Sequence, residues 1–202
     1  DYPNDLWDLS ATVNQFGEAL DPKLGFVPRP GTRSYQMGAA YQPRPTGSAF
    51  SWVRQFFYEL SVRRVDNITG FAESLPNANP HCGIESWRVF TAPFNVETQT
   101  GEHLEANWTG QFECLREDAE IAGVVIPAGS YRFDRYRVEA QSSRHRSWRV
   151  GTTWWFGGFF DGNLSQLRQF AHGSSPGGHV QLRLEREADT GHAGGERIAQ
   201  RL

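Results

Sequence analysis

Residues 103–114 read HLEANWTGQFEC, and this segment is the clearest indication of the fold class. Its apolar side chains, which alternate with polar ones, are Leu104, Ala106, Trp108, Phe112 and Cys114. Successive side chains of a β-strand point to opposite faces, so a period of two predicts a strand with one apolar and one polar face. A helix would need apolar neighbours at both three and four positions, and this stretch does not supply them.

The same period of two recurs along the chain. It is found at residues 7–13, 34–42, 50–62 and 180–185. The segments 84–97, 131–141 and 147–160 are less regular, and Pro93 predicts a bulge because proline has no N–H for a ladder hydrogen bond. The aromatic cluster at residues 154–160 is equally compatible with an interfacial girdle and with a buried core patch.

The composition is that of a polar chain with many aromatic side chains. The 202 residues include seven Trp and fourteen Phe, and the mean hydropathy is -0.57. This combination suits a β-wall with one apolar face and one wet face. The net charge of -3 gives no reason to expect nucleic acid as a partner, and no apolar run of about 18 residues predicts a transmembrane helix. The opening DYPNDLWDLS has no signal-peptide pattern, so either a leader has been removed or the chain is a piece of something longer, and the strand-like opening favours the second.

Long and short connections alternate between the predicted strands. The long ones are residues 15–31, 66–82 and 116–129, and the short ones are residues 42–47, 98–101 and 142–145. Bacterial outer-membrane barrels show this asymmetry between their two ends. We therefore predict an all-β fold, an antiparallel up-and-down transmembrane β-barrel, with residues 1–202 as a single domain or a fragment of one. About nine strands are predicted, and because closed bacterial barrels usually have an even number, we expect an incomplete portion.

Three phrases of the sequence resemble a known bacterial family of unknown function. They are FGEALDPKLGFVPRPGTRSY (16–35), IPAGSYRFDRY (126–136) and FGGFFDGNLSQL (156–167), in the order and spacing of that family's C-terminal barrel domain. In that family the barrel follows a family-nine-like carbohydrate-binding module. The resemblance implies a barrel in the bacterial outer membrane, with membrane lipid as a partner and glycans reached only through the preceding module. This chain lacks that module and ends at GGERIAQRL, where the family continues through further hairpins.

Alternation also assigns side chains to the two faces of the predicted wall. If Tyr136, Val138 and Ala140 face outward, their neighbours face the lumen, because charge is strongly disfavoured against lipid. The lumen-facing charge candidates are Arg135, Arg137, Glu139, Arg149, Glu105 and Glu113. They predict either an anion-attracting lining or a salt-bridged polar plug, and the similar supply of Arg and Glu favours the plug. The membrane-facing aromatic candidates are Trp7, Tyr35, Trp52, Tyr58, Trp108 and Trp154.

The two cysteines, Cys82 and Cys114, form a candidate disulfide. A hairpin turn at residues 98–101 would place them about three residues out of register, so two unpaired thiols are favoured, although a pairing near the loop end stays open.

The sequence contains no recognised catalytic or metal-binding pattern. No Gly-x-Ser-x-Gly, P-loop or Cys-x-x-Cys is present, and no two histidines have metal-ligand spacing, so we expect no enzyme activity, no metal and no cofactor. The acidic residues Glu117, Asp118 and Glu120 are better interpreted as a solvated loop than as a calcium site.

Two functional hypotheses follow. The first is a non-enzymatic outer-membrane barrel that serves as a structural or transport module with an Arg/Glu interior. The alternative is a soluble secreted β-sandwich that binds polysaccharide through exposed aromatic residues. The solute, the pore state and the oligomeric state are not predicted.

Overall fold

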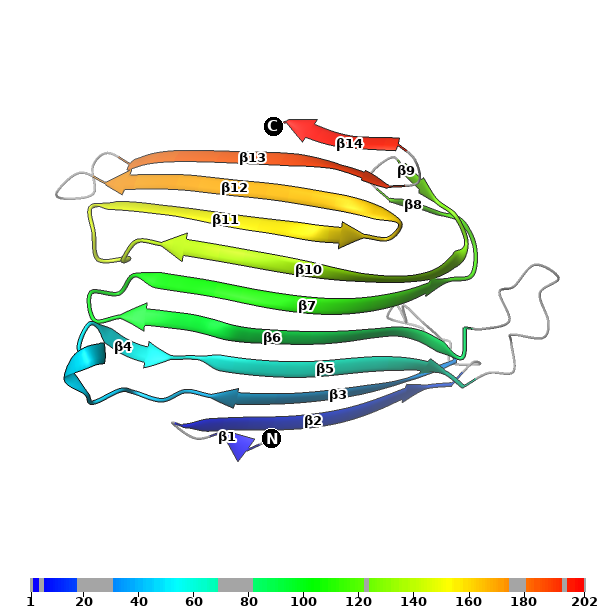
Figure 1. Cartoon of the computed structure of the whole chain (residues 1–202), viewed down its shortest axis with the longest axis horizontal. Helices are drawn as coiled ribbons and strands as arrows, with labels where there is room; N and C mark the ends of the chain where they lie inside the picture. The colour runs from blue at the N-terminus through cyan, green and yellow to red at the C-terminus, as the bar shows by residue number, and fades with distance from the viewer. Residues whose placement is uncertain are drawn as a thin grey trace.

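The computed structural model of the chain is one large antiparallel sheet accompanied by a small hairpin (Figure 1). It describes residues 2–3, 6–17, 31–68, 82–121, 124–174, 181–193 and 196–201. The sheet has twelve strands in the order β1-β2-β3-β5-β6-β7-β10-β11-β12-β13-β14, and β4 pairs with β6 beside this path. The separate hairpin is formed by β8 and β9.

Nine strands of the sheet have ten residues or more, and three are shorter. The long ones are β2 (Trp7–Phe16), β3 (Thr32–Tyr41), β5 (Tyr58–Asn67), β6 (Ile84–Thr98), β7 (His103–Leu115), β10 (Gly129–Gln141), β11 (Trp148–Phe159), β12 (Gly162–Ser174) and β13 (Gln181–Ala193). The short ones are β1 (Tyr2–Pro3), β4 (Val53–Phe56) and β14 (Glu196–Arg201). The remaining elements are β8 (Ala119–Ile121), β9 (Val124–Ile126) and the 3-10 helix η1 (Ser48–Phe50). The prediction of an all-β antiparallel fold is confirmed.

The sheet is open in the part of the chain that the structure describes. Its hydrogen-bonded path runs from β1 at one edge to β14 at the opposite edge, and no ladder between described residues joins the two (Figure 1). Closure into a barrel therefore stays a prediction. Over the described residues, no helix is long and apolar enough to cross a membrane.

The two ends of the sheet differ in their connections. We call the end with residues 99–102 and 142–147, which link β6 to β7 and β10 to β11, the turn end (left in Figure 1). At the opposite end, which we call the hairpin end, the chain forms the β8–β9 hairpin after leaving β7 and before entering β10 (right in Figure 1). Residues 116–128 form the predicted long connection between β7 and β10, but the sequence did not predict the β8–β9 hairpin within it. Strands of three residues are too short for their alternation to be recognised.

The predicted continuous strand at residues 50–62 is wrong. Residues before Val53 lie in η1 and a turn, and β4 and β5 pair with successive parts of β6 rather than forming one strand. The pairing of β6 with β7 shifts between Thr91 and Phe94, which is the irregularity predicted at Pro93. Because Pro93 cannot donate a ladder hydrogen bond, β6 is distorted where β4 gives way to β5.

A buried apolar cluster lies at the hairpin end. Val124, Ile126 and Ala193 are buried there, with Tyr131, Phe159 and Phe160 among the side chains packed against them. Phe160 has a φ of 52° in the turn to β12, and its ring lies 5.3 Å from that of Tyr131. The aromatic run at residues 154–160 is thus divided. Its end belongs to this cluster, whereas Trp154 contacts Phe156 on the exposed surface.

Candidate functional site: a polar network on one face of the sheet

The two faces of the sheet have opposite character. On β10, Arg135, Arg137 and Glu139 are more buried than Tyr136 and Val138, with which they alternate. Cross-strand partners in an antiparallel pair lie on the same face. The register therefore shows which residues of the other strands share a face with Arg137 and Glu139, and which share a face with Tyr136 and Val138. We call the face with Arg137 and Glu139 the polar face, and the face with Tyr136 and Val138 the apolar face.

All six predicted charged residues lie on the polar face. Glu139 of β10 is the direct partner of Glu105 on β7. Tyr131 lies eight residues before Glu139 and therefore on the same face, and its partner is Glu113. Thr153 of β11 is opposite Glu139, which places Arg149, four residues earlier, on this face as well.

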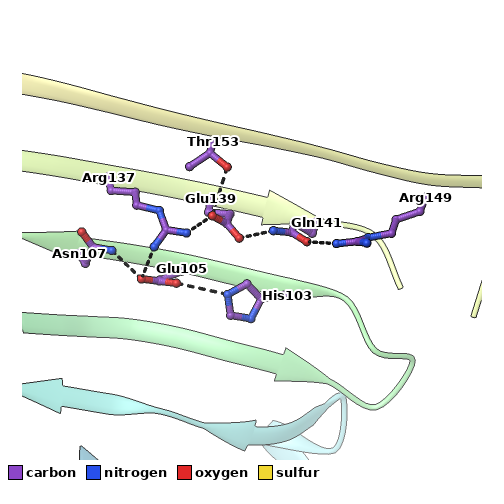
Figure 2. A network of polar contacts seen from close by, with 8 residues as sticks. All are labelled: His103, Glu105, Asn107, Arg137, Glu139, Gln141, Arg149 and Thr153. Carbon is purple, nitrogen blue, oxygen red and sulfur yellow. Dashed lines mark hydrogen bonds and ion pairs between the residues drawn. The ribbon is translucent and has the colours of Figure 1, made fainter. Parts of the chain in front are cut away.

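Arg137 joins the two opposed carboxylates into one network (Figure 2). Its guanidinium donates a hydrogen bond through Nη1 to Glu105 Oε1 at 3.1 Å and another through Nη2 to Glu139 Oε2. Glu105 and Glu139 are only 8% and 6% exposed. Like charges directly opposite each other destabilise a sheet, so the arginine between them offsets a repulsion that burial would intensify.

Neutral side chains extend the network along the strands. Asn107 Nδ2 donates to Glu105 Oε1 at 2.5 Å, and Thr153 Oγ1 donates to Glu139 Oε2 at 3.1 Å. Gln141 donates to Glu139 and accepts a hydrogen bond from Arg149 at 3.0 Å (Figure 2). His103 Nε2 lies 3.3 Å from Glu105 Oε2. The carboxylates are therefore largely satisfied within the protein.

The three predicted arginines are all engaged. Arg135 donates to the Leu164 carbonyl oxygen and to Gln166 Oε1, both at 3.0 Å. The Arg137 guanidinium lies 5.6 Å from the Trp155 ring centre, and that of Arg149 lies 5.0 Å from the Phe170 ring centre. Of the three, Arg137 is ion-paired with carboxylates, whereas Arg135 and Arg149 donate to neutral oxygens. The Nε groups of Arg137 and Arg149 are buried without an acceptor among the described residues, so the choice between a salt-bridged plug and an anion-attracting lining stays a prediction.

Sequence reasoning missed a second arginine group on the polar face. Arg63 of β5 is the direct partner of Arg88 on β6. No signal in the sequence could have paired them, because their register depends on a connection of 16 residues between β5 and β6. The network partners His103, Asn107, Gln141 and Thr153 were missed too, although their alternation with apolar neighbours placed them on the right face.

The apolar face carries most of the predicted aromatic residues. The partners Trp7 and Tyr41 have ring centres 4.5 Å apart, and Tyr41 stacks on Tyr58 at 6.2 Å, which forms an aromatic row near the turn end. Five of the six predicted residues lie on this face: Trp7, Tyr35, Tyr58, Trp108 and Trp154. Trp52 is different: it is exposed but precedes β4 and lies outside the strands, because the predicted strand at 50–62 is interrupted.

Charged side chains on the apolar face gather toward the hairpin end and have partners. Arg33 donates to Gln15 Oε1, and Arg64 pairs with Asp66 at 2.6 Å. The Arg132 guanidinium lies 5.2 Å from the Trp87 ring centre, and Trp108 Nε1 donates to Asp134 at 3.0 Å. Arg186 on β13, opposite Gln169, is an exception in the middle of its strand.

A disulfide joins Cys82 to Cys114, with their Cα atoms 5.8 Å apart. The two unpaired thiols favoured by the register are thus not observed. Cys82 precedes β6 in a turn, so counting in register along the β6–β7 ladder does not apply to it.

Glu102 forms a separate cluster in the turn between β6 and β7. Hydrogen bonds from Thr100 and Thr98, together with the nearby Arg146 guanidinium, lower the pKa of its carboxyl to about 2. This cluster fixes the turn and the following connection to each other at the turn end.

The described residues contain no group of three or more His, Cys, Asp or Glu side chains placed to hold a metal ion. In comparisons with known proteins, no family model, no curated protein and no solved structure matches the chain. The contrast between the two faces of the sheet is therefore the main indication of function.

Proposed function

We propose that this chain forms the wall of a β-barrel in the bacterial outer membrane, with its apolar face against lipid and its polar face lining the interior. One observation carries this proposal. Among the described residues, 22 large apolar side chains are exposed, whereas only eight hydrophobic residues are buried. Nine polar residues, including Glu105, Asn107 and Glu139, are buried, which is one more than the buried hydrophobic residues. This distribution is the reverse of that in a water-soluble domain.

The spread of the exposed apolar side chains over many strands supports a lipid environment. A soluble monomer rarely exposes a large contiguous apolar patch. Here exposed apolar side chains occur on strands from β2 to β13, including Leu9, Leu60, Val138 and Leu184. Lipid would cover such a surface without a dedicated protein partner.

The distribution of charges supports the same orientation. Arg33, Arg64 and Arg132 lie toward the hairpin end of the apolar face, while Ala39, Leu60 and Tyr136 share a central cross-strand row without charge. Charged side chains are tolerated near the membrane interface and disfavoured at its midplane.

A membrane wall also requires every strand edge to be paired. Unpaired backbone N–H and C=O groups are not tolerated in the hydrocarbon region. The edges at β1–β2 and at β14 would therefore pair with each other or with further strands when the barrel is complete.

The proposed role is structural or transporting and non-enzymatic. The Glu105–Arg137–Glu139 network would act as a polar filling that stiffens the wall and narrows the interior. The Cys82–Cys114 disulfide fits a route through an oxidising compartment, such as the periplasm.

Membrane fractionation of cells that express the protein tests the proposal. We expect it in the outer-membrane fraction, extracted only by detergent, with a shift in gel mobility when the SDS sample is heated. Recovery in the soluble fraction, monodisperse in detergent-free buffer, would defeat the membrane assignment.

A soluble polysaccharide-binding domain is the second candidate. The stacked row of Trp7, Tyr41 and Tyr58 could pack against sugar rings. A β-sandwich, however, needs a second sheet, and besides the main sheet the described residues form only the β8–β9 hairpin. Retardation in polysaccharide-containing native gels, together with recovery in the soluble fraction, would favour this candidate.

A further inference from the structure

We propose that Arg63 and Arg88 form a binding site for a small oxyanion on the polar face. The inference deepens the proposed function, because in a barrel these residues would give the interior its preference for anions. They lie on β5 and β6, which are adjacent in the sheet (Figure 1), and they are direct cross-strand partners.

The two arginines lack the partners that the other polar-face arginines have. Among the described residues, no hydrogen bond, ion pair or ring contact engages either guanidinium. By contrast, Arg168 pairs with Glu187 at 3.0 Å and Arg183 with Glu185 at 2.7 Å. Directly opposed like charges destabilise a sheet pair, so an unbridged arginine pair gains stability when an anion binds between the two.

Neutral hydrogen-bonding groups flank the pair on both sides. Gln36 of β3 is the partner of Arg63, and Gln111 of β7 is the partner of Arg88, so one row across four strands reads Gln-Arg-Arg-Gln. Amide N–H groups and forked guanidinium groups together suit an oxyanion, because each guanidinium donates two parallel hydrogen bonds to carboxylate or phosphate oxygens.

Two hollows meet at the pair, and both are lined by Arg63 and Arg88. One, of 310 Å³, also contains Ser34, Ser86 and Gln111, and the other, of 340 Å³, contains Gln36 and Ser61. Each is at the small end of the range of ligand sites. Glu113 lines the first hollow and Glu59 lines the second. These carboxylates would limit the bound species to a small anion close to the arginines.

Inorganic phosphate is the probe for the test. The full chain is titrated with phosphate against chloride at constant ionic strength, in detergent or in plain buffer, whichever keeps it folded, and binding is followed by calorimetry and by thermal unfolding. We expect phosphate to raise the unfolding temperature of the wild-type protein. Arg63→Gln and Arg88→Gln should each weaken binding about tenfold or more, because each removes a charge-assisted contact.

Arg64→Gln is the matched control. It makes the same change of charge on the same strand, but Arg64 lies on the apolar face and pairs with Asp66. Its phosphate affinity should equal that of the wild type. Without phosphate, Arg63→Gln and Arg88→Gln should unfold at a higher temperature than the wild type, because each relieves the repulsion. These gains also show that the variants fold.

Two results would overturn the inference: no phosphate binding by the wild-type protein, or equal binding by all four proteins. The outcome is independent of the membrane assignment, because fractionation decides that assignment and phosphate titration decides the site. If the protein is a membrane barrel, reversal potentials in planar bilayers give a second readout. Wild-type channels should prefer anions over cations, and the double variant Arg63→Gln/Arg88→Gln should lose that preference.

Discussion

At the scale of single residues, Arg137 has the most consequential position in the polar network. It lies between two carboxylates that face each other directly across β7 and β10. Its own side chain is 27% exposed, whereas both carboxylates are below one tenth exposed. Breaking one partner of a buried ion pair leaves an uncompensated charge, and here it would leave two like charges opposed.

Arg137→Met should therefore lower the free energy of unfolding by about 3 kcal/mol. The measurement is a urea titration of the folded full chain. Arg168→Met is the matched control, since the Arg168–Glu187 pair is 56% and 36% exposed and an exposed pair contributes about 1 kcal/mol or less. Adding Glu105→Gln to Arg137→Met should recover part of the loss by removing one of the opposed charges. Equal losses in Arg137→Met and Arg168→Met would contradict the bridging role.

The lowered pKa of Glu102 predicts that the stability of the protein depends on pH in the acid range. Its pKa of about 2 in the folded protein is below the ordinary 4.5, with the Thr100 hydrogen bond as the largest cause. The unfolded chain therefore binds this proton more tightly, so the stabilisation is fully present above pH 4.5 and is lost as the pH falls through 2.

The check compares free energies of unfolding of the wild type and Glu102→Gln over this pH range. The difference between the two proteins should shrink as the pH falls. Thr100→Val, which removes the strongest hydrogen bond, should raise the pKa of Glu102 and reduce the slope. A difference that stays constant from neutral pH down to about pH 2 would refute this assignment.

At the scale of strands, alternation predicted the elements well and their interruptions poorly. Within residues 131–141 the apolar side chains switch from one face of the strand to the other, but no bulge causes this switch. β10 pairs with β7 in unbroken register. Tyr131 and Phe133 lie on the polar face, where they pack in the cluster at the hairpin end. Pro93 correctly predicted the irregularity in β6, because its missing N–H removes a ladder hydrogen bond at its own position. The turn that brings Cys82 to Cys114 depends on tertiary packing, which a count of register could not foresee.

The disulfide should stabilise the fold by about 3–4 kcal/mol, because it closes a segment in which the two cysteines are 32 residues apart. Adding a reductant should lower the unfolding temperature of the wild-type protein, and it should leave Cys82→Ser/Cys114→Ser unchanged. Thiol titration of the denatured, unreduced protein should detect no free thiol. Two thiols per chain in that titration would exclude the bond.

At the scale of the whole molecule, one sheet separates two environments. A period of two was sufficient to place eight of the nine long strands, although it gave no range for β12 and missed the interruption before β5. It was also sufficient to separate the polar from the apolar face and to place most of the predicted aromatic residues. It was insufficient for the Arg63–Arg88 pairing and for closure of the sheet, because register and edge pairing depend on contacts distant in sequence. The environment of the apolar face is consequently the property most in need of a physical test.

A charge placed in the middle of the apolar face provides that test. Leu60 is 50% exposed and pairs with Ala39 and Thr91 in an uncharged row. In lipid, Leu60→Arg should lower the free energy of unfolding by about 2–4 kcal/mol, whereas at an exposed site in water such a change is usually within about 0.5 kcal/mol. Ser130→Arg, at an exposed apolar-face position near the hairpin end, should lower it by no more than about 1 kcal/mol. Unfolding is measured in lipid vesicles, and equal small effects at both positions would mean that the apolar face contacts water rather than hydrocarbon.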